Sequence, residues 1–188
     1  MKKISLIFGA ALMTLVMASC GSEKQVTAPA PQATNYPCPD CKATPDVFKY
    51  LGQHVASSDR QMQQARSMAA NNARAELATM VNATVKRVVD NYTSEYINGN
   101  DSEFKSRLQD ISRTVVSQLL TGTPVTCEGV MPSTSTPGAT ICFACVELTG
   151  KSVLDGIASK VSNDEKLRTD FEYEKFKQVL DDEMSKLQ

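Results

Sequence analysis

The chain contains no tryptophan, a single histidine and few aromatic residues, which make up 6% of its 188 positions. Its charge is balanced, with 20 basic and 21 acidic side chains. A surface that binds nucleic acid usually combines a basic face with interleaved aromatic side chains. Because the sequence offers neither feature, we expect no nucleic-acid partner.

Recognisable catalytic motifs are also missing. A serine or cysteine nucleophile that needs a histidine base would have to use His54. The sequence has no Gly-x-Ser-x-Gly elbow, no His-Glu-x-x-His pair and no glycine-rich phosphate loop. We therefore predict that the protein is not an enzyme and needs no cofactor, metal or small-molecule substrate, and we interpret His54 as a strand residue.

No apolar run near the N-terminus is long enough to span a membrane. The run at 4–16 follows Lys2 and Lys3, whereas a spanning helix needs about 20 apolar residues and a signal-peptide core only about 7 to 15. Directly after this run, Met17-Ala18-Ser19-Cys20 resembles the lipobox of bacterial lipoproteins. We therefore predict a signal peptide over residues 1–19, which is cleaved before a lipidated Cys20. An ordinary signal peptide with a chance cysteine is the alternative.

Lipidation of Cys20 would attach the protein to a membrane by its N-terminus. Two or three acyl chains hold a protein almost permanently, because each buried methylene contributes about 0.8 kcal/mol. In lipoproteins of this type an Asp after the cysteine often marks retention at the inner membrane, and this sequence has Gly21 there. We therefore expect a lipid anchor at the cell outer membrane.

Residues 20–46 predict a tether between the lipid and the folded domain. This segment holds five of the eight prolines and few large apolar side chains, a composition that does not form its own core. At about 3.1 Å per residue, an extended stretch over 21–37 would reach roughly 50 Å. The folded domain is then expected over residues 47–188.

The domain begins with a predicted strand and a long helix. The strand covers 47–56, and a Ser58/Gln61 capping box opens the helix, which is expected to end at Asn98-Gly99. Small side chains recur along the helix at steps of three and four, which favours close packing against a sheet. This stripe is expected to be core, and its main members are Ala65, Ala69, Ala73 and Leu77.

Two further strands follow a second helix that spans about 104–119. They are predicted over 123–131 and 139–149, and the last strand is apolar on both faces, which suits a central position. The sequence therefore predicts an α+β fold: a small antiparallel sheet in the order 1-3-2, packed on the long helix. The second sheet face needs a cover, which either the C-terminal helices or a second copy of the domain would provide.

A helical extension is predicted from about residue 151. It contains a short helix at 152–160 and a longer one opened by Ser162 and Glu165. The longer helix carries a narrow apolar seam, which would dock on the domain or pair with another helix. The seam consists of Tyr173, Phe176, Leu180, Met184 and Leu187.

The alanine-rich helix also resembles a known family. The segment Gln63-Gln-Ala-Arg-Ser-Met-Ala-Ala-Asn-Asn-Ala-Arg-Ala-Glu-Leu-Ala78, placed after Tyr50-Leu-Gly52, is similar to the helix pattern of the lipoprotein-20 family of bacterial outer-membrane lipoproteins. The resemblance covers about residues 47–149 and implies an α+β domain with a helix on a small antiparallel sheet. Some relatives serve in flagellar and surface assemblies. The cysteine pairs are not part of that pattern.

Five cysteines remain after Cys20, so at least one is left without a partner inside the chain. In an exported protein they are disulfide candidates. Hairpin register places Cys127 opposite Cys145, which predicts a cross-strand disulfide between them. Register leaves Cys142 as a free thiol on the opposite face of the strand. Cys38 and Cys41, which are close in the tether, are predicted to form a local disulfide.

The cysteines could also form a thiol redox site or a zinc site. Cys38-Pro-Asp-Cys41 has the spacing of a thiol redox site, but no helix follows it to lower a thiol pKa. Together with Cys142 and Cys145 it has the residue types of a four-thiolate zinc site, but those two lie three apart on a strand and point to opposite faces.

The leading hypothesis is a non-enzymatic envelope protein with a structural or assembly role, which contacts the membrane, a protein partner or a second copy of itself. A cysteine-based metal-binding or redox module is the alternative.

Overall fold

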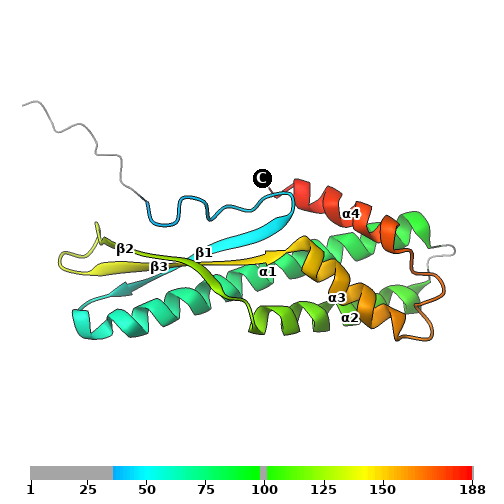
Figure 1. Cartoon of the computed structure of the whole chain (residues 1–188), viewed down its shortest axis with the longest axis horizontal. Helices are drawn as coiled ribbons and strands as arrows, with labels where there is room; N and C mark the ends of the chain where they lie inside the picture. The colour runs from blue at the N-terminus through cyan, green and yellow to red at the C-terminus, as the bar shows by residue number, and fades with distance from the viewer. Residues whose placement is uncertain (1–35, 98–100, 188) are drawn as a thin grey trace, which may run out of the picture. The chain divides into compact units, whose positions relative to one another are not determined.

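The computed structural model describes residues 36–97 and 101–187. The predicted signal peptide, Cys20 and the Asn98-Gly99 helix end lie outside these residues. In the described part, an antiparallel sheet lies against one half of a long helix, and shorter helices surround the other half (Figure 1). The predicted α+β class and the strand order β1-β3-β2 are confirmed.

The sheet consists of β1 (Val47–Ala56), β2 (Val125–Pro132) and β3 (Thr140–Thr149). Strand β3 is central and pairs antiparallel with both neighbours. Because both faces of β3 are covered, its residues from Cys142 to Val146 are all buried. The expectation from its two apolar faces is thus correct.

Helix α1 (Met62–Tyr96) follows a short 3₁₀ turn, η1 (Asp59–Gln61). The predicted capping box takes a different form. The side chain of Gln61 accepts a hydrogen bond from the backbone N–H of Ser57 at 3.0 Å, and the Ser58 side chain makes no capping bond.

The first half of α1 packs closely on the sheet through its alanine stripe. Ala69 and Ala73 are fully buried, and they lie over Gly52 of β1. A Cβ atom on Gly52 would lie 2.2 Å from the carbonyl oxygen of Ala69 and 2.4 Å from the amide nitrogen of Ala73. The absence of a side chain at Gly52 therefore sets how near the helix can lie to the sheet.

The second half of α1 forms a helical bundle with α2 (Ser102–Thr121), α3 (Gly150–Ser162) and α4 (Tyr173–Ser185). Here larger side chains replace the alanines. The ring of Tyr92 lies 5.3 Å from that of Phe176, with the two rings edge to face. The buried residues of this core include Leu77, Val81, Val88, Leu108, Ile157, Leu167 and Leu180.

Helix α4 begins later than predicted. The expected start at Ser162 and Glu165 is wrong, because the chain from residue 164 to 172 forms turns rather than helix. The Tyr92 hydroxyl accepts a hydrogen bond from the backbone N–H of Glu172 at 2.8 Å, and Leu167 is fully buried. These tertiary contacts hold the segment in a shape that local helix preference does not indicate.

The apolar seam of α4 docks on α1, as one of the two expected arrangements. Beside it, Glu183 is only 3% exposed and accepts hydrogen bonds from Arg87 at 2.8 Å and Asn91 at 3.0 Å. Hydrogen bonds from Lys186 and, to a smaller extent, from Arg87 lower the pKa of Glu183 below its ordinary value of 4.5. This carboxylate ties α4 to α1 as long as it is ionised.

Replacing Gly52 with alanine tests the close contact between helix and sheet. We expect Gly52→Ala to lower the free energy of unfolding by about 3 kcal/mol, because the added carbon meets two backbone atoms that cannot move independently. Urea unfolding measures the change. Gly122→Ala is the control, since a Cβ there would have its nearest neighbour at 4.0 Å; its effect should stay within about 0.5 kcal/mol. Equal effects of the two changes would contradict the close-packing interpretation.

The contact between α4 and α1 should depend on pH through Glu183. Its lowered folded-state pKa means that the carboxylate stabilises the fold above pH 4.5 and that this stabilisation is lost as the pH falls through the folded pKa. We expect Glu183→Gln to lower the free energy of unfolding by about 1 to 3 kcal/mol at pH 7. The difference from wild type should shrink below pH 4.5. Glu174→Gln, an exposed change on the same helix, is the control and should have little effect at any pH.

Candidate functional site

Residues 36–46, here called the strap, lie across the sheet on the face opposite α1 (Figure 1). The strap turns at Cys38, which has a positive φ of 57°, and the N–H of Cys41 donates to the carbonyl of Cys38 at 3.0 Å. At its end, the carbonyl of Asp46 accepts a hydrogen bond from the N–H of Gly150 at 2.8 Å. The strap thus contacts the domain at both ends.

Two disulfides bond the strap to the sheet. Cys38 is joined to Cys127 of β2, and Cys41 is joined to Cys145 of β3, with Cα separations of 5.8 Å and 5.9 Å. These are the four cysteines expected to form disulfides. The predicted pairing is wrong, however, because the structure contains neither a Cys127–Cys145 nor a Cys38–Cys41 bond among its described residues.

The register behind that prediction is nevertheless correct. Cys127 and Cys145 are direct partners in the β2–β3 ladder, so their thiols lie side by side on one face. The Cys38–Cys41 turn brings two more thiols over the same spot, and each strap cysteine takes one strand cysteine. Hairpin register locates strand residues relative to each other, but it carries no information about a third segment that crosses them.

The strap also corrects the predicted boundary between tether and domain. Tyr36 packs edge to face on Phe143 with ring centroids 5.2 Å apart, and Pro37 fills the space above Gly129, where a Cβ would lie 2.4 Å from the proline. Residues 36–46 therefore belong to the folded domain. They cover the sheet face that was expected to be covered by C-terminal helices or a second copy.

Cys142 lies on the other face of β3, as predicted, and has no disulfide. Its side chain is fully buried among alanines of α1 and the sheet, including Ala65 and Ala69. Burial raises the pKa of the Cys142 thiol, which disfavours the reactive thiolate. His54 is its register partner on β1 and is a half-buried strand residue.

This arrangement separates the groups that a redox or zinc site would need. A zinc site made by the four cysteines of the two Cys-x-x-Cys pairs would require Cys142 beside Cys145, but these side chains point to opposite faces of β3. The strap cysteines are already bonded to two different strands. Within residues 36–97 and 101–187, no cluster of three or more His, Cys, Asp or Glu side chains is placed to hold a metal ion.

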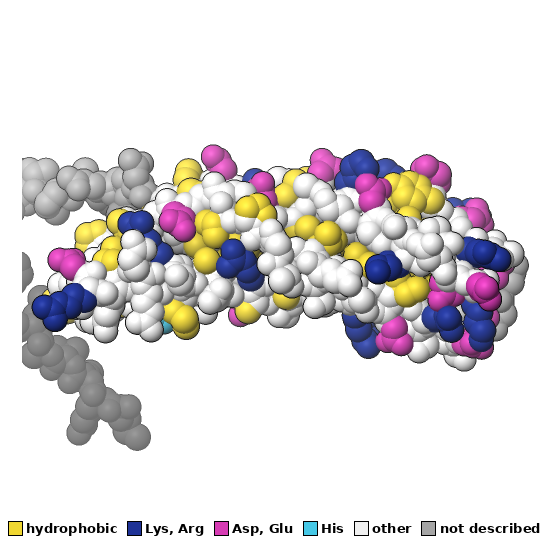
Figure 2. All heavy atoms as spheres, turned by 60° about the horizontal axis from the view of Figure 1, so that its bottom comes forward, with side chains coloured by type: hydrophobic (Ala, Val, Ile, Leu, Met, Phe, Trp, Pro, Cys, Tyr) yellow, Lys and Arg dark blue, Asp and Glu magenta, His cyan; other side chains and the backbone are white. Residues whose placement is uncertain are grey.

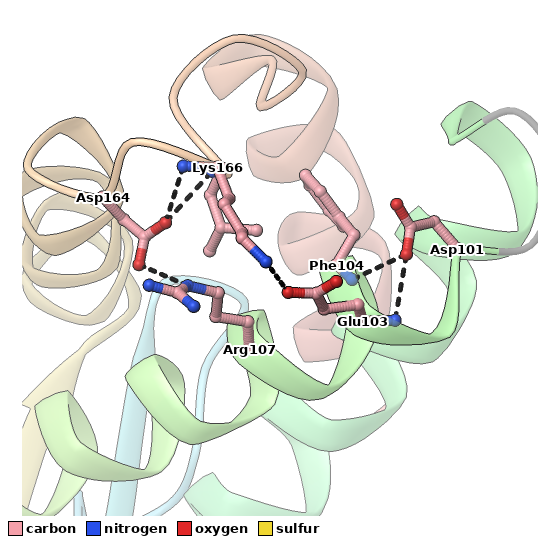
Figure 3. Close-up of polar contacts among 7 residues, drawn as sticks. Asp101, Glu103, Phe104, Arg107, Asp164 and Lys166 are labelled. Atoms are coloured by element: carbon pink, nitrogen blue, oxygen red, sulfur yellow. Dashed lines mark hydrogen bonds and ion pairs between the residues drawn. The ribbon is translucent and has the colours of Figure 1, made fainter.

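A cluster of charged side chains lies where α2 begins (Figure 3). Asp101 caps the helix by accepting hydrogen bonds from the N–H groups of Glu103 and Phe104 at 2.9 Å and 3.0 Å. Across from it, Arg107 pairs with Asp164 at 2.7 Å, and Lys166 pairs with Glu103. These contacts attach the segment after α3 to α2.

The charged side chains of this cluster pair with one another, so its arrangement is explained without a ligand. The hydrogen bond from Arg107 lowers the pKa of Asp164, so this carboxylate stays ionised and paired. Figure 2 shows that charged side chains of both signs gather at the bundle end of the molecule, while the middle of that face is largely uncharged. In the described chain, no buried side-chain nitrogen or oxygen lacks a hydrogen-bond partner.

Comparison of the chain with protein-family models, curated proteins and solved structures gave no match. The resemblance to the lipoprotein-20 family therefore stays a prediction. None of the helices that the structure describes combines the length and apolar content needed to cross a membrane.

The disulfide pairing can be tested by peptide mapping without reductant. We expect one linked peptide pair that contains Cys38 and Cys127 and another that contains Cys41 and Cys145. Cys142 should react with an alkylating agent only after unfolding, because its side chain is fully buried. A peptide that links Cys127 to Cys145 would contradict the pairing, and it would also show that the strap is not bonded to the sheet as described.

Proposed function

We propose that the protein is a lipid-anchored component of the cell envelope with a non-enzymatic structural or assembly role at the outer membrane. In this proposal, residues 1–19 direct export, Cys20 carries the lipid, and the domain from residue 36 onward is presented on a short tether. The folded domain serves as a rigid body that is held near the membrane and contacts other envelope proteins.

The observation that carries this proposal is the covalent attachment of the strap. The segment that follows the predicted lipid anchor is bonded to the central strand by Cys41–Cys145 and to an edge strand by Cys38–Cys127. A pull on the tether would therefore act on the sheet itself, instead of peeling away a loosely attached end. Two disulfides also agree with an exported location, because such bonds persist in oxidising compartments.

The charged groups support a structural role. Glu183 holds α4 on α1, and Asp164 and Lys166 hold the segment after α3 on α2. The alternative, a cysteine-based redox or metal module, gains no support from the cysteine positions. Its thiols would have to come from two closed disulfides and one buried cysteine on the opposite face of β3.

Substitution of Cys20 tests the anchor. We expect Cys20→Ala to abolish incorporation of labelled palmitate and to release the protein from the membrane fraction or leave it unprocessed. Cys142→Ala is the matched control, because it removes another cysteine and should leave labelling unchanged. Palmitate incorporation that survives Cys20→Ala would refute the anchor, and a loss of label with Cys142→Ala would show that the assay reports folding rather than lipidation.

A further inference from the structure

The four disulfide-bonded cysteines, here called the cysteine cluster, lie together over one spot of the sheet. Cys127 and Cys145 are direct partners in the β2–β3 ladder. Directly opposed residues of antiparallel strands have Cα atoms about 4.5 to 5.5 Å apart, which is within the range of a disulfide. These two cysteines are therefore placed to bond to each other as well as to the strap cysteines that they are joined to.

The two strap cysteines are also neighbours. Cys38 and Cys41 are the first and last residues of one turn, which is closed by the 3.0 Å hydrogen bond from the N–H of Cys41 to the carbonyl of Cys38. The Cα atoms at the two ends of such a turn lie less than about 7 Å apart. Each member of the cysteine cluster thus has two others beside it: the one that it is bonded to and its neighbour in the ladder or in the turn.

The disulfides are accessible to a small reagent. A cavity of about 270 Å³ is lined by all four cysteines, with residues of the strap on one side and of the strands on the other. Each bond joins a well-buried residue to a half-buried one: Cys38 is 8% exposed and Cys145 is 2% exposed, whereas Cys41 and Cys127 are half-buried. An incoming thiolate therefore meets the sulfur of Cys41 or Cys127 first.

We propose that the cysteine cluster is a site of thiol–disulfide exchange, at which a small monothiol moves both disulfides and releases the strap from the sheet. The pairing after exchange is Cys127 with Cys145 and Cys38 with Cys41. Because the chain holds two disulfides before and after, it is neither oxidised nor reduced. The monothiol acts as a catalyst, since it is regenerated at the end.

Three exchange steps connect the two pairings, and each step forms one S–S bond and breaks another. The incoming thiolate attacks the sulfur of Cys41, and Cys145 leaves as a thiolate. Cys145 then attacks its ladder partner Cys127, and Cys38 leaves as a thiolate. Cys38 finally attacks Cys41 in the same turn, which forms the Cys38–Cys41 bond and expels the thiolate that began the sequence.

Exchange changes what holds the strap on the domain. The contacts of Tyr36, Pro37 and Asp46 are noncovalent, so after exchange no covalent bond resists a pull on the tether. Once released, residues 36–46 add up to roughly 35 Å of extended chain to the tether. This consequence rests on the proposed function, whereas the exchange itself depends only on the cysteine positions. A failed test of the Cys20 anchor is therefore distinguishable from a failed test of exchange.

Single substitutions isolate the second and third steps. Every protein is the full chain with Cys20→Ala, so that only five cysteines are present. In Cys41→Ser, the thiol of Cys145 lies beside the Cys38–Cys127 bond, and we expect a Cys127–Cys145 bond to form without any added thiol. In Cys127→Ser, the thiol of Cys38 should likewise form a Cys38–Cys41 bond. Acid quenching and peptic mapping without reductant, with fragmentation of the linked peptides, identify the bonds.

Cys142 provides the matched control within each protein. It is on the same strand as Cys145 but on the opposite face, so shuffling through unfolded chains would use both residues, whereas local exchange uses only Cys145. In Cys41→Ser we expect the bond to Cys145 to exceed any bond to Cys142 at least about tenfold, because neighbouring groups react at a high effective concentration. The double variant Cys41→Ser with Cys145→Ala should keep its Cys38–Cys127 bond. Circular dichroism confirms that each variant is folded.

The complete sequence of steps is tested with all five cysteines present. A low concentration of 2-mercaptoethanol is added without oxygen at about pH 8, where an ordinary thiol is partly ionised. We expect linked peptides for Cys127–Cys145 and Cys38–Cys41 to appear in equal amounts, with no increase in free thiol. Loss of the original bonds to free thiols without new linked peptides would overturn the proposal. So would retention of the Cys38–Cys127 bond alone in Cys41→Ser, or equal bonding of Cys127 to Cys142 and Cys145.

Discussion

The close contact between α1 and β1 at Gly52 is the constraint on which the arrangement of the domain depends. Backbone atoms of Ala69 and Ala73 occupy the space that a side chain at Gly52 would need. Because the backbone of α1 lies so close to the sheet at this point, alanine side chains are large enough to fill the core along its first half. The same straight helix then leaves the sheet and supplies larger side chains, such as Val88 and Tyr92, to the bundle. One helix of 35 residues thus joins two different kinds of core.

The strap completes the layers on the other side of the sheet. With α1 below and the strap above, β3 is buried on both faces although the sheet has only three strands. Small sheets of this kind gain much of their stability from such covers. The strap has few apolar side chains of its own, and covalent bonds to Cys127 and Cys145 take the place of a large buried surface.

The sheet end and the bundle end of the domain differ in the groups they carry. The strap is bonded to the sheet end, whereas the bundle end carries most of the charged surface shown in Figure 2. Helix α1 runs through both ends, so one continuous element joins the sheet layer to the helical bundle.

The sequence alone determined the kind and order of the elements, because helices and strands bury side chains at periods that are visible in short windows. The alanine stripe, the doubly apolar β3, the pairing of Cys127 with Cys145 in register and the opposite face of Cys142 all follow from these local rules. Only the tertiary structure decided where the strap lies, which disulfides form and where α4 begins. Each of these depends on a contact between segments that are distant in the sequence, such as Cys41 with Cys145 or Glu172 with Tyr92. A short segment that crosses a sheet or ends in turns has no periodic pattern, so nothing in its own residues indicates its partner.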